Sequence, residues 1–264
     1  MTEPSVRVAP IPGKRPNAAC RLIDEVTGHT FRAIPRSTIG GPDVQVARRV
    51  HSRCVSRYQA IGLLLAFNQP DDGYALLRGL MLDAQRLQVM ARRPTARVAL
   101  AIGWMEGAVR DLEDRAATAD RVGERRFAAA IRAITVPQRE ALDRVQRESG
   151  VRRRLHLPDE GKPLAVAAGH PEDELDYVIG SDPTHGSLPA SLWHDRGVAG
   201  GGAIVVGGSD AGWRNTVADR ATRHMVRATA ALAAICGFPN SADVSAYAAD
   251  IERRLDAEDL PGKD

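Results

Sequence analysis

The sequence predicts an all-α fold, an antiparallel helical bundle of about six or seven helices with an N-terminal arm and a Gly-rich insertion. Apolar residues recur at steps of three and four in five separate segments, which is the period of a helix face. Aromatic residues make up only 4% of the 264 residues, so Ala, Val, Leu and Ile must supply the core contacts. We expect three parts, namely a partly extended N-terminal arm, a single α-helical domain and a frayed tail. They span residues 1–41, 42–258 and 259–264.

The N-terminal 41 residues are rich in Pro and Gly and show no helical period. Residues 20–33 have the composition of a short hairpin that turns near Gly28. We therefore expect an arm that covers the body of the protein or a partner subunit, and a homodimer formed by packing the arm across a two-fold axis.

From Asp43 onward the chain follows the helical period. Two helices are separated by a short break at residues 68–73, so they should pack antiparallel, with Asp71 or Asp72 capping the second. The predicted inward faces are Ala47, Val50, Cys54, Tyr58, Ile61 and Leu65, followed by Leu77, Leu80, Met81, Ala84 and Leu87.

A third helix is expected from about Thr95 to Ala119. The pattern resumes after Gly123, and Pro137 should start a separate charged helix that ends near Glu148. The helical period is lost over residues 150–169, which we interpret as an exposed loop. A short helix then begins at Pro171 with an acidic first turn.

The C-terminal part contains a long helix over roughly residues 211–236 and a last amphipathic helix that Ser241 should cap. His224 falls on the apolar face of the long helix. It is either a core histidine bonded to a neighbour or a functional residue opposite His185.

Composition limits the classes of function. A net charge of +3 does not by itself imply a polyanion partner, so nucleic acid binding is only weakly supported. Three widely spaced cysteines suggest a reducing compartment, and no apolar run reaches the length of a membrane span. We expect a cytoplasmic protein that does not enter a membrane.

Hydrogen-bonding side chains are concentrated where a helix breaks at Asp182-Pro183. Tyr177 and Ser181 are four residues apart, so they share a helix face, and His185 and Ser187 follow the break. We expect these four side chains to form either a ligand-binding polar pocket or a buried network.

Other motifs are missing from the sequence. It has no metal-binding spacing, so we expect neither a metal nor a cofactor. The glycine turn at residues 207–208 matches no nucleotide-binding fingerprint, and Asp210 would repel a phosphate there. No His follows an Arg at the spacing of the helical-bundle ribonucleases of bacterial defence systems.

Two short motifs resemble a family of mostly bacterial α-helical proteins known only as a domain of unknown function. One is Ala75-Leu-Leu-Arg78, and the other joins Tyr177 and Ser181 to His185-Gly186. The resemblance covers roughly residues 43–236 and implies a helical fold with a site near these motifs. It departs at Leu82, where the family has an acidic residue. Asp83 comes one position later, and on a helix it points about 140° away from Arg78.

We therefore expect a binding or interaction module, with a role in stress or defence and a small anionic ligand near Tyr177–Ser187. The alternative is a metal-independent enzyme that acts on an anionic substrate such as a nucleotide or RNA. In that case His185 or His224 would be the general base, and Arg78 or Arg220 would hold the substrate.

Overall fold

The computed structural model confirms the all-α fold. It describes residues 17–35, 40–151, 155–177, 195–198, 202–205 and 211–257. The α-helices are α1 (Ala18–Ala33), α2 (Pro42–Ala66), α3 (Pro70–Arg92), α4 (Arg97–Arg121), α5 (Arg125–Ser149), α6 (Lys162–Ala168), α9 (Ala211–Cys236) and α10 (Ser241–Asp256). Two short 3₁₀ helices are η1 (Pro94–Ala96) and η2 (Pro171–Asp173), and residues 174–177 continue η2 as a helical turn.

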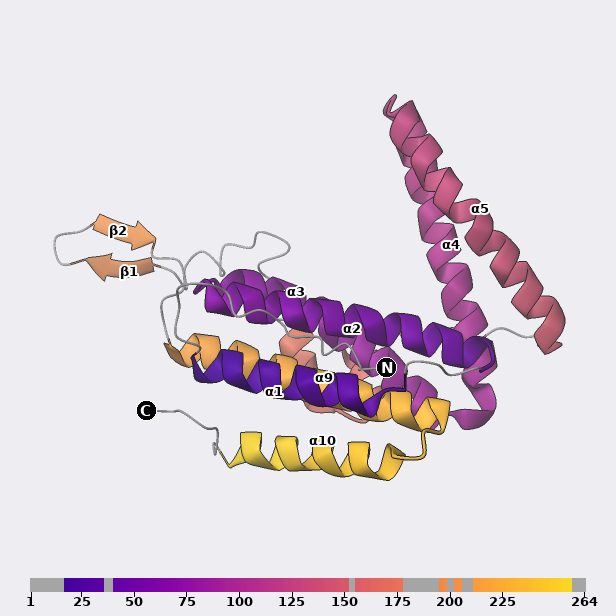
Figure 1. The fold of residues 1–264 in the computed structure, drawn as a ribbon. Helices are drawn as coiled ribbons and strands as arrows, with labels where there is room; N and C mark the ends of the chain where they lie inside the picture. Colours follow the sequence, from indigo (N-terminus) through magenta and orange to yellow (C-terminus); the bar gives the residue numbers. More distant parts are fainter. Residues whose placement is uncertain are drawn as a thin grey trace, which may run out of the picture.

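The core forms where α3 and α9 pack against each other and against α2, with α1 and α10 closing the bundle (Figure 1). Every residue predicted to face inward on α2 and α3 is buried, as is the α9 face from Val217 to Ile235. Arg97 links the C-terminal ends of α3 and α9. Its guanidinium donates to the carbonyl oxygens of Met90 and Ala91 in α3 and of Ile235 in α9. The helical period thus identified the core-facing sides of α2, α3 and α9.

The hairpin expected at residues 20–33 is wrong, because this segment forms helix α1. The Asn17 side chain caps α1 by accepting from the Cys20 backbone N–H. The apolar face of α1 packs on α9 and α2, and Val26 is fully buried. Residues 18–33 thus belong to the hydrophobic core of their own chain, and the extended arm expected there does not form.

Three local expectations in the middle of the chain also differ from the structure. Pro137 starts no new helix, since α5 runs through it. Part of the expected loop at 150–169 is helix α6, which packs on α3. Neither Asp71 nor Asp72 caps α3, because Gln69 holds the cap position and Asp71 accepts from the Trp213 indole N–H at 2.9 Å.

Ser241 does not cap α10, because Asn240 takes the cap position and makes no side-chain cap bond. The predicted α10 face of Val244, Ala248, Ile251 and Leu255 is nevertheless buried. The apolar pattern therefore located helix α10 correctly, whereas the residue predicted to cap it was wrong.

Helices α4 and α5 form a long antiparallel hairpin that projects from the bundle (Figure 1). At its base the backbone of Leu155 crosses α4 so closely to Gly103 that a Cβ at residue 103 would overlap the Leu155 carbonyl oxygen. Farther out, large apolar side chains of the hairpin are exposed. They are Val122, Phe127, Ile134 and Val136.

The Gly-rich insertion contains two short antiparallel strands, β1 (Asp195–Val198) and β2 (Gly202–Val205). Their register pairs Asp195 with Val205 and Val198 with Gly202. Among the described residues, no helix has both the length and the apolar content needed to cross a membrane.

Candidate functional site

Four arginines gather on one face of α2 and α3, and we refer to Arg53, Arg57, Arg78 and Arg86 as the arginine cluster. The buried carboxylate of Asp83 joins three of them. It accepts from Arg53 at 2.8 Å and from Arg86 at 3.3 Å, and it also pairs with Arg57. Positions 53 and 57 are one turn apart on α2, so the helix geometry brings both side chains to Asp83 on the neighbouring helix.

Glu160 extends this network to Arg78. Its carboxylate accepts from Arg86 at 2.8 Å and lies 3.5 Å from Arg78. Within the described part of the chain, Asp83 and Glu160 are the carboxylates that pair with the four arginines. The arginine side chains are between 20% and 52% exposed, so solvent and solutes can reach them.

Two aromatic rings contact three of the four guanidinium groups. Arg53 and Arg86 both lie 5.5 Å from the centre of the Trp104 ring. Arg78 lies 4.7 Å above the Tyr177 ring and donates to the Tyr177 hydroxyl at 3.1 Å. A guanidinium stacked on a ring keeps its N–H groups free to point sideways at a planar anion.

A second group of charged residues is buried between η2, α3 and α9. His224 contacts Asp176 through Nε2 at 3.4 Å and Asp173 through Nδ1 at 3.8 Å. Arg227 donates to Asp173 at 3.1 Å, and Arg220 lies 3.4 Å from Asp176. We refer to Asp173, Asp176 and His224 as the acid–histidine cluster.

Two further side chains from α3 reach the acid–histidine cluster. Gln85 donates through its amide N–H to Asp173 at 3.3 Å. Burial raises the pKa of the Tyr74 hydroxyl, and the negative charge of Asp176 raises it further. Tyr74 therefore stays protonated and can donate to a carboxylate at any physiological pH.

The structure brings the predicted site residues into two separate groups. Arg78 and Tyr177 meet at the edge of the arginine cluster, while Arg220 and His224 meet at Asp176. His224 is buried beside Asp173 and Asp176. The predictions for Ser181, His185 and Ser187 lie outside the described residues.

The sequence interpretation missed the carboxylates that organise both groups. Arg78 has its partner in Glu160, 82 positions away in sequence, and Asp83 pairs instead with arginines of α2 and with Arg86. One local signal was present: Asp173 and Asp176 stand three residues apart at the start of a helical turn, so both carboxylates can face the same helix.

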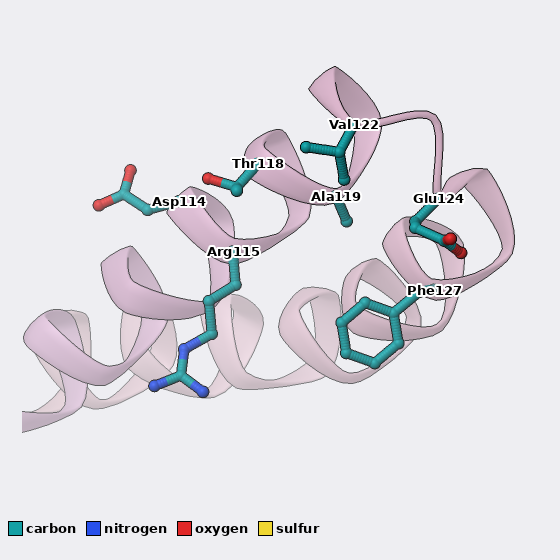
Figure 2. A pocket seen from close by; sticks show the side chains of 7 residues that line it. All are labelled: Asp114, Arg115, Thr118, Ala119, Val122, Glu124 and Phe127. Atoms are coloured by element: carbon teal, nitrogen blue, oxygen red, sulfur yellow. The ribbon is translucent and has the colours of Figure 1, made fainter. Parts of the chain in front are cut away.

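A separate pocket of about 550 Å³ lies at the far end of the α4–α5 hairpin (Figure 2). Val122 and Phe127 form its apolar part, and Asp114 and Arg115 lie on its rim. It contains none of the residues that the sequence singled out as a site.

Comparison with known proteins identified no relative of this chain. No protein-family model matches the chain, and neither does any curated protein or any solved structure. The site must therefore be interpreted from its own geometry.

Proposed function

We propose that the protein is a binding module that holds a small anionic ligand at the arginine cluster, next to Tyr177. The observation that supports this most is that four partly exposed arginines gather on one face of the bundle. Clustered positive charge attracts anions, and the rigid fork of a guanidinium suits the paired oxygens of a phosphate or carboxylate.

The alternative is a metal-independent enzyme with a histidine base. Its candidate base His185 lies outside the described residues, and the version that uses His224 and Arg220 has less support. A general base must lie within hydrogen-bond reach of the proton that it takes from the substrate. The His224 side chain is buried, and each of its ring nitrogens faces a carboxylate. Arg220 contacts one of these carboxylates, so both residues are occupied within the protein.

Binding of inorganic pyrophosphate, measured by isothermal titration calorimetry at low salt, tests the proposal. We expect Arg53→Ala to weaken binding about tenfold or more, because a hydrogen bond to a charged group contributes about 1.5–3 kcal/mol. The variant should stay folded, since Arg53 is half exposed and Asp83 keeps its pairs with Arg57 and Arg86.

Arg49→Ala is the matched control for this experiment. Arg49 lies one turn from Arg53 on α2, is exposed, and its removal changes the net charge equally. Affinity should therefore remain near that of the wild type. Equal loss in both variants would show a general charge effect, and an absence of saturable binding in the wild type would contradict the proposal.

We also propose that the protein forms a homodimer, and that the α4–α5 hairpin provides the contact between the two copies. Helix α5 packs mainly on α4, and Phe127 and Ile134 lie seven residues apart on one of its exposed faces. Two copies related by a two-fold axis would bury this face against itself.

Sedimentation velocity should show a dimer at micromolar concentration and a monomer for Phe127→Ser. A monomeric wild type would rule the dimer out.

A further inference from the structure

The acid–histidine cluster has the composition and spacing of a cation site. One ligand atom each from Asp173, Asp176 and His224 can be chosen so that all three lie within 4.8 Å of one another. Ligands of one metal ion, bonded at about 2.0–2.2 Å, are separated by about 3–4 Å. The three side chains are therefore close enough to converge on one ion with a small shift of their positions.

The two contacts between His224 and the carboxylates of the cluster are long. His224 is 3.4 Å from Asp176 and 3.8 Å from Asp173, whereas N–H···O bonds in proteins measure about 2.7–3.2 Å. A neutral imidazole also carries only one N–H, so it can donate to one of the two carboxylates and not to both. Protein groups alone satisfy this buried cluster incompletely.

Gln85 provides an independent indication of a missing partner. Its side chain is buried, and its amide nitrogen donates to Asp173, yet no described residue is a hydrogen-bond partner of its carbonyl oxygen Oε1. A buried carbonyl without a partner costs about 1–3 kcal/mol, so such groups are normally satisfied. A cation beside Asp173 would supply the partner, because an amide oxygen is a ligand for hard and intermediate metal ions.

The local charge balance also favours a cation. Arg220 and Arg227 pair with four carboxylates in total, which belong to Glu172, Asp173, Asp176 and Glu252. Asp173 and Asp176 are almost completely buried, and Arg227 shares its charge between Asp173 and the more exposed Glu172 and Glu252. Buried carboxylates need close positive partners, and a divalent ion would add one.

We propose that Asp173, Asp176 and His224 bind one divalent transition-metal ion, with the Gln85 carbonyl oxygen beside it. Two carboxylates, one imidazole and one amide oxygen form a mixed oxygen and nitrogen set, which suits Mn²⁺ or Zn²⁺ better than an all-oxygen cage would. The site lies apart from the arginine cluster and does not depend on the anion-binding proposal.

The test uses Mn²⁺ as the probe. Full-length protein is treated with EDTA, dialysed and titrated with MnCl₂, and free Mn²⁺ is followed by electron paramagnetic resonance. We expect one bound Mn²⁺ per chain with micromolar or tighter affinity, and a thermal midpoint that rises with Mn²⁺ concentration, because an ion that binds the folded state stabilises it.

Two substitutions and one control assign the site. His224→Gln and Asp176→Asn should each weaken Mn²⁺ binding at least tenfold, while circular dichroism checks that both variants remain helical. His170→Gln should bind as the wild type does, since His170 is a neighbouring histidine that pairs with Glu172 outside the cluster. The proposal fails if the wild type shows no saturable binding up to roughly 100 µM Mn²⁺, a concentration at which even a weak site would be partly occupied. It also fails if both cluster variants retain full affinity.

Discussion

Replacing Arg227 by Met should lower the free energy of unfolding by about 3–5 kcal/mol at neutral pH. The Arg227 side chain is mostly buried and pairs with Asp173 at 3.1 Å and with Glu252. Met fills much of the same volume without the charge, so the change isolates the loss of the cation. It leaves the buried Asp173 carboxylate without its guanidinium, and an unpaired buried charge is far more costly than a missing surface ion pair.

Arg223→Met is the matched control on the same helix. Arg223 pairs with Asp256 at 2.7 Å, but Asp256 is 70% exposed. Exposed ion pairs contribute about 0–1 kcal/mol, so this variant should unfold near the wild-type midpoint in urea. If the two variants differ by less than about 1 kcal/mol, the buried pair does not stabilise the fold in the way the structure indicates.

The second large effect is a loss of stability in mild acid that arises from His51. Burial, aided by the positive charge of Arg48, lowers the pKa of the His51 imidazole from 6.5 to about 4. The Thr229 hydroxyl donates to the Met225 carbonyl, so the neutral His51 ring donates through Nε2–H to the Thr229 oxygen at 3.1 Å. The folded protein therefore holds this histidine neutral.

The sign of the pH effect follows from the lowered pKa. Below pH 6.5 the unfolded chain takes up a proton at His51 and the folded chain does not, so stability falls as the pH falls from about 6.5 toward 4. The loss from this residue should reach about 2–3 kcal/mol near pH 4.5.

Urea unfolding of the wild type and of His51→Gln at pH 7 and pH 4.5 measures this contribution. Gln keeps an N–H donor for Thr229 but does not titrate, so its stability should fall less on acidification. Carboxylates titrate in both proteins and cancel in the comparison. Equal losses on acidification would mean that His51 does not stay neutral in the fold.

The sequence by itself determined the helices that carry a continuous apolar stripe. The predicted bounds of α9 match the structure, and the stripes of α2 and α3 are buried throughout, because a 3.6-residue period with apolar side chains can only be satisfied by packing that face. Helix α1 escaped prediction because Gly28 and its threonines have weak intrinsic helix propensity. Packing of its apolar face on α9 compensates for that weakness, and a local pattern contains no information about such packing.

Only the tertiary structure decided which charged residues meet. Asp83 meets Arg53 and Arg57 across two helices, and His224 meets Asp176 across 48 positions of sequence. Ion pairs and ligand sets of this kind depend on distances between elements that are fixed by core packing, and no spacing along one helix encodes them. The apolar stripes thus specified the bundle. Both the arginine–tyrosine contact and the buried acid–histidine cluster arose because residues 171–177 lie against α3 and α9.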